Sequence, residues 1–415
     1  MPASDMRPGR ADGAHVLGDQ PAREVIRVSS PASLLAAIPV VLRFEPTEAS
    51  IVVLGTTPPR SAVAVTLRYD ITSTRYADLI ARHSAAILAA QGIKAACAVG
   101  YGPGDLVTPV ADALRAQFAE NRITVAELLR FQDGRYWSYV CTDPGCCPPE
   151  GKEFNPEAHP VTRKYAGRIL ASREALAATV APVTGDAADS MRRATRAARQ
   201  RATRIVARAG QGRRPGVQRR ALLQHGLKAV ADALDLYRAG GKFTSHRDAA
   251  WLALFLQGLQ VRDDAWARMI PEHREAHLRL WTDLTTLAQP GYVAAPASLL
   301  AFTAWQDGDG ALANVALDRA LADNPRYSMA LLLREALDAG APPSMARLPM
   351  TPEDVAAAYD QNEAAEEGEE AGEAAGQAPD PDQSGDGSAA GGEEDDRRAA
   401  GDDAAAVSAL AGAVT

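Results

Sequence analysis

The chain has 415 residues, more than one typical domain needs, and 47% of them are hydrophobic while only 5% are aromatic. Alanine supplies much of this hydrophobic content, which favours closely packed helices. The sequence has no apolar run of the roughly 18 residues that a membrane span needs, no signal-peptide pattern and only four cysteines. These features argue against a membrane-spanning or disulfide-rich secreted protein and predict a cytoplasmic one.

The formal net charge of −8 is unevenly distributed along the chain. Of the 52 acidic residues, 18 lie between Glu353 and Asp403, where only Arg397 and Arg398 oppose them. The residues before Glu353 carry 42 basic against 34 acidic side chains. We therefore predict a disordered acidic tail over residues 346–415, which could screen a basic surface. Residues 1–24, rich in Gly, Pro, Ala and Asp, are predicted to be a disordered leader.

Residues 25–182 are predicted to form a mixed α/β domain. Ser30 and Pro31 are an N-cap and first-turn pair that opens a short helix, which Pro39 should end. Branched runs at 51–54 and 62–67 predict a β-hairpin. The other predicted elements are a helix over 76–90, a strand over 94–99, a helix over 103–120, strands over 123–129 and 135–140, and a closing helix over 161–180. This alternation predicts a mixed sheet with flanking helices.

Three glycines, Gly100, Gly102 and Gly104, occupy the turn between a predicted strand and a predicted helix. Backbone N–H groups and the helix dipole can hold an anion at such a turn. The spacing is neither G-x-G-x-x-G nor that of a P-loop. We therefore favour a tight connection whose glycines serve positive φ angles.

Residues 135–151 combine aromatics, three cysteines and turn-forming residues. Cys141, Cys146 and Cys147 could supply thiolates to zinc, with His159 as a fourth ligand. The spacing contains no C-x2-C pair, however, and the side chains of adjacent cysteines usually diverge. On this basis no metal site is predicted.

A nucleophilic cysteine is the second alternative for this stretch. Asp143 is near in sequence, but no histidine can be assigned as its partner base. The favoured interpretation is a structural thiol cluster buried by Trp137 and Tyr139.

Residues 183–220 form an arginine-rich segment in which 191–209 contain seven arginines and no acid. Small residues spaced three or four apart give this helix a thin apolar stripe. The functional interpretation is an arm that contacts phosphates. No aromatic residues are interleaved for base stacking, so a solvated linker helix is favoured.

Residues 221–345 are predicted to be an all-α domain, with 251–259 as its central helix. Arg262, Asp263 and Asp264 follow, and either carboxylate is expected to cap the next helix, although the group could instead line a groove. His273 and His277 lie one turn apart, but they do not form H-E-x-x-H, so we interpret this spacing as chance.

A helical hairpin is predicted over residues 297–321. Trp305, the Gly-containing turn at 307–310, small residues at Ala313 and Ala316 and the terminal Pro325 are similar to one tetratricopeptide unit of about 34 residues. One such unit is too short for a solenoid.

Several motifs together resemble a known family. They are Ser30-Pro31, residues 99–102 (Val-Gly-Tyr-Gly), residues 136–139 (Tyr-Trp-Ser-Tyr) with Cys141, Asp143, Cys146, Cys147 and Pro148, residues 261–266 (Val-Arg-Asp-Asp-Ala-Trp), and Ala304-Trp305 with residues 308–310. Over roughly residues 25–343 the chain resembles an actinobacterial family of unknown function (domain of unknown function 4192). Arg43 stands where this pattern would have a glycine. The resemblance implies no activity, substrate or catalytic residue.

The sequence therefore favours a binding or regulatory module with a protein or small-molecule partner and no assigned cofactor. One alternative is a hydrolase or transferase with its site between the 100–104 loop and the 135–147 stretch. A second is a non-specific nucleic-acid binder that uses the arginine-rich segment. The candidate functional residues are Gly100, Gly102, Gly104, Asp133, Arg135, Trp137, Ser138, Cys141, Asp143, Cys146, Cys147, Arg262, Asp263 and Asp264.

Overall fold

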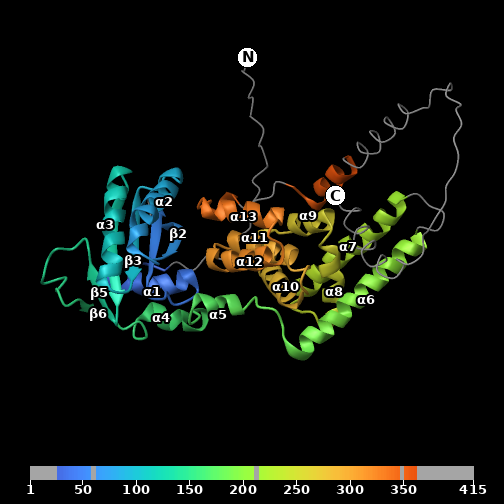
Figure 1. Ribbon diagram of the computed structural model, residues 1–415, viewed down its shortest axis with the longest axis horizontal. Helices are drawn as coiled ribbons and strands as arrows, with labels where there is room; N and C mark the ends of the chain where they lie inside the picture. The colour runs from blue at the N-terminus through green and yellow to red at the C-terminus, as the bar shows by residue number, and fades with distance from the viewer. Residues whose placement is uncertain (1–25, 58–61, 210–214, 346–349, 362–415) are drawn as a thin grey trace, which may run out of the picture.

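A computed structural model describes residues 26–57, 62–209, 215–345 and 350–361. The predicted leader over 1–24 and the tail from 362 onward lie outside these residues. A sheet with its helices lies at one end of the molecule and a helical part at the other (Figure 1). Within the described ranges, none of the helices has both the length and the apolar character needed to cross a membrane.

The sheet has six strands in the order β2-β1-β3-β4-β5-β6. β3 and β4 are parallel, and every other neighbouring pair is antiparallel. The predicted mixed α/β fold and its first hairpin are thus confirmed. The strands are β1 (Ser50–Thr57), β2 (Ala62–Asp70), β3 (Ala95–Tyr101), β4 (Thr124–Gln132), β5 (Arg135–Ser138) and β6 (Lys152–Glu153).

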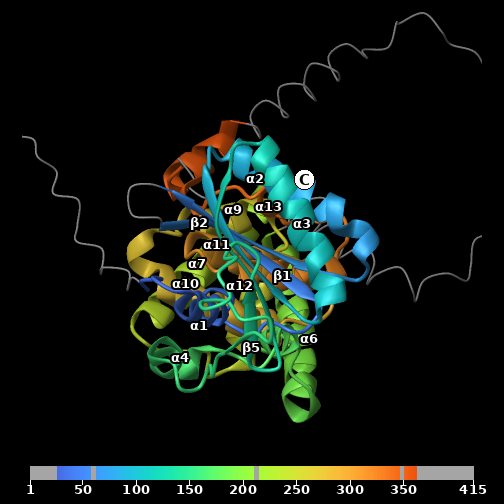
Figure 2. The same ribbon diagram turned by 90° about the vertical axis from the view of Figure 1, so that its left-hand side faces the viewer.

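Alternating side chains of β1 show how helices cover both faces of the sheet. Ile51 and Val53 belong to one hydrophobic cluster, which they share with α2 (Ala77–Ala90) and α3 (Gly104–Glu120). Val52 and Leu54 belong to another, which includes five of the buried residues of α1 (Pro31–Leu42), namely Leu34, Leu35, Ala36, Ile38 and Leu42. Because successive strand side chains point to opposite faces, α1 lies across the sheet from α2 and α3 (Figure 2).

Helix α1 begins as predicted but extends past its proline. Ser30 and Ser33 form a reciprocal capping box, with the Ser33 amide donating to Ser30 Oγ over 3.2 Å. The expected end at Pro39 is wrong, because Pro39 lies inside a helix that continues to Leu42. Both Pro39 and Leu42 are buried, and this burial offsets the backbone hydrogen bond that proline cannot make.

The predicted helix over 161–180 is wrong in its middle. Two short helices, α4 (Pro160–Tyr165) and α5 (Arg173–Ala178), stand in its place. Between them Leu170 pairs with the backbone beside Phe44, donating to the Arg43 carbonyl over 2.8 Å and accepting from Glu45 over 2.9 Å. These hydrogen bonds replace the helical ones. Ser172 caps α5 as expected, accepting from the Ala175 amide.

Eight helices of eight or more residues follow between Gly185 and Asp338 in the part of the chain that the structure describes. They are α6 (Gly185–Ala209), α7 (Pro215–Arg238), α8 (His246–Phe255), α9 (Leu259–Ala267), α10 (Arg274–Leu287), α11 (Ala294–Gln306), α12 (Gly310–Asp323) and α13 (Ser328–Asp338). The predicted central helix over 251–259 is therefore interrupted after Phe255. Gly258 occupies the N-cap of α9, so Asp263 and Asp264 lie inside that helix and do not cap it.

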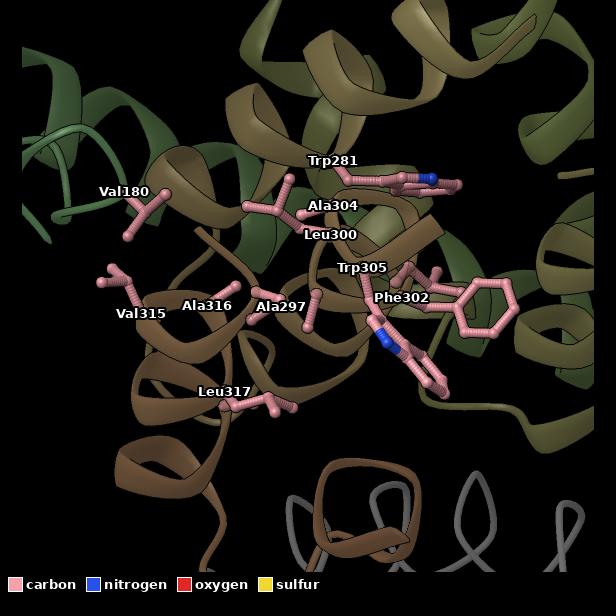
Figure 3. Close-up of a cluster of buried hydrophobic side chains, with 14 of the residues drawn as sticks. Val180, Trp281, Ala297, Leu300, Phe302, Ala304, Trp305, Val315, Ala316 and Leu317 are labelled. Atoms are coloured by element: carbon pink, nitrogen blue, oxygen red, sulfur yellow. The ribbon is translucent and has the colours of Figure 1, made fainter. Parts of the chain in front are cut away.

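Helices α11 and α12 pack against each other beside α10. Figure 3 shows Trp281 of α10 near Leu300 and Ala304 of α11, with Ala316 of α12 beside Ala297. The small side chains let the helices approach closely. The likeness of the α11–α12 pair to a tetratricopeptide unit stays a prediction.

The helical region and the α1 face of the sheet share one hydrophobic cluster, which contains both Leu34 and Trp281. A hydrogen bond supports this continuity, since Arg319 Nε of α12 donates to the Val180 carbonyl, after α5, over 3.3 Å. The predicted domain boundaries stay predictions.

Residues 352–361 differ from the predicted disordered tail, because they form a helix. Val355 is buried, and the Tyr359 hydroxyl donates to Asp263 Oδ2 over 2.8 Å. This hydrogen bond joins the helix to α9.

Candidate functional site

The β4–β5 hairpin fixes the positions of most predicted site residues. Asp133 and Gly134 both have positive φ, 49° and 72°, as a two-residue hairpin turn requires. Asp133 is therefore a turn residue. The turn sets a register in which Arg130 opposes Trp137 and Leu129 opposes Ser138.

The Trp137 ring lies close to both a cation and a glycine. The guanidinium carbon of Arg130 is 3.6 Å from the centroid of the Trp137 ring, a close cation–π contact. A β-carbon at Gly151 would come within 2.5 Å of the same ring, so only glycine fits there. The indole N–H donates to the Pro149 carbonyl over 2.9 Å. Trp137 thus anchors the 141–151 loop to the sheet.

The three candidate glycines serve packing and backbone geometry. A β-carbon at Gly100 would overlap Cγ1 of Val107, so this glycine lets α3 lie close to β3. Gly102 has a φ of 129°, which favours glycine. A β-carbon at Gly104 would lie 3.7 Å from the Arg130 guanidinium carbon. The 100–104 loop therefore adjoins the stacked Arg130–Trp137 pair.

Ser138 lies on the opposite face of β5 from Trp137, because it is the next residue in the strand. Its hydroxyl donates to Glu127 Oε1 over 2.9 Å and accepts from the amides of Val140 and Cys141. Ser138 thereby fixes the start of the cysteine loop. The sheet separates this hydroxyl from the 100–104 glycines, so the two halves of the enzyme-site hypothesis do not face each other.

The three loop thiols converge. The Sγ atoms of Cys141, Cys146 and Cys147 lie within 4.8 Å of one another. They are not buried as expected, since Cys146 is exposed and the other two are half-buried. The expectation of diverging neighbours is also wrong, because the Asp143 carbonyl accepts from both the Cys146 and Cys147 amides, at 3.1 and 2.7 Å. This helical turn brings both cysteines back towards Cys141.

The thiols differ in acidity. Hydrogen bonding with the Asp143 backbone, followed by contacts with the other thiols, lowers the pKa of Cys141. Desolvation, followed by those same contacts, raises the pKa of Cys147 to about 12. Cys141 therefore ionises before Cys147.

His159, the suggested fourth zinc ligand, does not belong to the group that the thiols form in the described structure. It caps α4, where Nδ1 accepts from the Val161 amide over 3.3 Å. Its ring lies beside Phe154, with a centroid separation of 6.0 Å. This contact assigns it a structural role.

The remaining charged candidates form ion pairs. Arg135 contacts Glu153 at 2.6 Å at the sheet edge. Arg262 pairs with Asp263, and Arg268 donates to both carboxylate oxygens of Asp264, at 2.7 and 2.9 Å. These α9 pairs lie in the helical region, so they do not join the thiol loop in one site.

His273 and His277 do not form a ligand pair. The buried His277 ring lies between the Trp281 indole N–H, 3.2 Å from Nδ1, and the Arg268 carbonyl, 3.1 Å from Nε2. Desolvation by burial lowers its pKa to about 4. His277 is thus a neutral core histidine.

Helix α6 carries a continuous basic face. Its apolar stripe packs against α7 and α8, with Met191, Ala194, Ala198 and Ala202 buried. The prediction of a solvated linker helix is therefore wrong for the apolar stripe, which is buried. Four exposed arginines lie on the side of α6 away from this stripe: Arg193, Arg196, Arg204 and Arg208.

None of these four side chains forms an ion pair or hydrogen bond with another residue that the structure describes. Other arginines of α6 are engaged, since Arg192 pairs with Asp189 at 3.0 Å and Arg201 stacks on Trp251 at 4.1 Å. The guanidinium groups of Arg193, Arg196, Arg204 and Arg208 form a surface that we call the arginine face.

Sequence reasoning missed Arg130 and Glu127 of β4, which contact Trp137 and Ser138. The signal was present, because the Asp133-Gly134 turn fixes the register that places Arg130 opposite Trp137. Glu127 lies on the same face of β4 as Leu129, which opposes Ser138, so its contact with Ser138 follows from the same register.

Comparison with curated proteins gives no match, and neither does comparison with solved structures. The family model described as Domain of unknown function (DUF4192) matches residues 31–344, so the chain belongs to that family.

Proposed function

We propose that this protein is a binding module whose ligand is the phosphate backbone of a nucleic acid and whose binding surface is the arginine face of α6. The observation that carries the proposal is a set of four exposed arginines on one side of a long helix that have no ion-pair or hydrogen-bond partner among the described residues. At 100° per residue they fall within a sector of about 120°, opposite the buried stripe.

The length of the arginine face suits an extended polyanion. From Arg193 to Arg208 the helix rises about 22 Å, over which one DNA strand presents about six phosphates. Exposed Arg220 lies near the start of α7, the end of the α6–α7 pair at which Arg208 lies, and adds positive charge there. Figure 1 shows α6 and α7 lying side by side at the outer end of the helical region.

The chemistry between the arginines favours nucleic acid over an acidic protein. The exposed positions among them are Ala197, Gln200, Thr203 and Ala207, which are small or polar. Protein interfaces usually centre on buried aromatic or large apolar anchors, whereas backbone phosphates need only donors and positive charge. Without groups that read base edges, binding should be independent of sequence.

The enzyme alternative receives less support from the site. Val107 and the Arg130–Trp137 stack fill the space beside the 100–104 loop. Ser138 contacts Glu127 on the other face of the sheet from this loop. A nucleophile, base and anion-binding loop on one side of the sheet would have favoured it.

The test compares two quadruple variants by fluorescence anisotropy with a labelled DNA duplex. One replaces Arg193, Arg196, Arg204 and Arg208 with glutamine. The control replaces Arg27, Arg82, Arg163 and Arg326, which are exposed arginines elsewhere, and changes the net charge equally. We expect the first variant to lose at least tenfold in affinity and the control to bind like wild type.

Equal losses in the two variants would contradict the arginine face as the binding surface. Absence of binding by the wild-type chain at low salt would contradict the function itself. Displacement of the duplex by an acidic protein at lower concentration than by unlabelled DNA would assign the surface to a protein partner.

A further inference from the structure

The thiol cluster has a geometry that its hydrogen bonds do not require. Ser138 and the Asp143 carbonyl fix the backbone of the loop, yet three side chains from different positions bring their sulfurs within 4.8 Å of one another. A disulfide would use two of these sulfurs and leave the third. A metal ion uses all three.

We propose that Cys141, Cys146 and Cys147 bind one thiophilic metal ion, for which Zn²⁺ is the representative. Thiolates are the ligands that Zn²⁺ and other soft or borderline ions prefer. The site lies in the α/β part and is independent of the arginine face.

The spacing fits such an ion closely. Three points no more than 4.8 Å apart lie within about 2.8 Å of a common centre, and a Zn–S bond is about 2.3 Å. Each sulfur therefore needs to move inward by no more than about half an ångström for an ion in their plane. Exposed Cys146 and half-buried Cys141 and Cys147 leave the ion a path from solvent.

The site would keep an open coordination position. Within the described ranges the three thiols are joined by no His, Asp or Glu side chain, and His159 is held at the N-terminus of α4. Three protein ligands leave the fourth position to water or to a small exogenous ligand, unlike a closed structural zinc site. Each sulfur that binds releases its thiol proton to solvent, so occupancy should rise with pH.

Metal binding should also make the 141–151 loop, which Trp137 contacts, more rigid. The Trp137 indole N–H donates to the carbonyl of Pro149, two residues after Cys147. A metal ion on the thiols and the Trp137 indole would therefore together hold residues 141–149 in place. This arrangement predicts that a metal protects the loop from proteolysis.

The test uses the reduced full-length chain, freed of metal and titrated with Co²⁺, which gives thiolate charge-transfer absorption when it binds. We expect the band to saturate at one equivalent and Zn²⁺ to abolish it. Cys141→Ser, Cys146→Ser and Cys147→Ser should each weaken binding at least tenfold.

Cys97→Ser is the matched control, because Cys97 lies in β3 outside the cluster and should leave binding unchanged. Circular dichroism of each variant separates loss of a ligand from loss of fold, and exposed Cys146 gives the variant least prone to unfold. Failure to reach one equivalent, or full affinity in Cys146→Ser, would overturn the proposal.

Discussion

The guanidinium of Arg43 lies 2.8 Å from a carboxylate oxygen of Asp309 and so joins the end of α1 to the start of α12. The Asp309 side chain is only 2% exposed, and its other oxygen accepts from the Leu312 amide as the N-cap of α12. Arg43 makes this contact from a left-handed conformation with a φ of 63°. An unfavourable backbone geometry is thus combined with an ion pair between the two parts of the molecule.

Replacing Arg43 with alanine should destabilise the protein by about 2 kcal/mol, because a buried carboxylate loses its counter-charge. Arg43→Gly should be less harmful than Arg43→Ala by about 1 kcal/mol, since glycine adopts positive φ without strain. Urea unfolding of both variants measures the difference. Equal or reversed stabilities would show that the backbone at this position is not left-handed.

Gly100 and Gly104 should respond oppositely to alanine. Gly100→Ala should cost about 1–3 kcal/mol, because its β-carbon would overlap Val107 and force α3 away from β3. Gly104→Ala has room, with its nearest atom 3.7 Å away, and should leave stability equal or slightly higher. Thermal melts of the two variants check this. If Gly104→Ala proved the more destabilising, the glycines would need a role other than packing.

How far the sequence predicts this fold depends on whether the deciding contacts are local. The Ser30 cap, the first hairpin and the apolar stripe of α6 follow from neighbouring residues, and the structure has all three. The extent of α1 beyond Pro39 and the break between α4 and α5 depend on burial and on pairing with distant backbone. Local propensity does not contain that information.

The candidate residues follow the same division. The Asp133-Gly134 turn can be predicted from these two residues alone. The convergence of Cys146 and Cys147 on Cys141 depends instead on hydrogen bonds to one carbonyl, that of Asp143. The charge of α6 is visible in the sequence. That Asp189 engages Arg192, and that Trp251 of another helix engages Arg201, is not visible there.

His277 should make the protein sensitive to acid. Its pKa is about 4 in the folded state and about 6.5 when unfolded, so the unfolded chain takes up the proton first as pH falls. Protonation would also place an N–H on Nδ1 against the Trp281 N–H. The stabilisation from the neutral ring is complete above about pH 6.5 and is lost towards pH 4, a change of about 3 kcal/mol.

Urea unfolding between pH 4 and 7 tests this effect. His277→Gln should flatten the pH dependence across this window, and His273→Gln, which changes a half-exposed neighbour, should leave it intact. An unchanged slope in His277→Gln would show that another group titrates.

Trp305 should be a core residue of the helical region. It is buried, it packs against Phe302 with a centroid separation of 6.2 Å, and its indole donates to the Ala341 carbonyl over 3.1 Å. Trp305→Ala should cost about 3–5 kcal/mol. Trp305→Phe keeps an aromatic ring and loses the hydrogen bond, so its cost should be nearer 1–2 kcal/mol. A melting temperature equal to wild type in Trp305→Ala would place the side chain on the surface.

The most direct test of the proposed function is the salt dependence of DNA binding. Each phosphate contact should contribute about −0.9 to the slope of log affinity against log salt. Replacing Arg193, Arg196, Arg204 and Arg208 together should therefore make the slope shallower by up to about 3.6, with the same change for unrelated duplex sequences. An identical slope in wild type and the quadruple variant, or strong preference for one duplex sequence, would contradict the proposal that the arginine face binds the phosphate backbone.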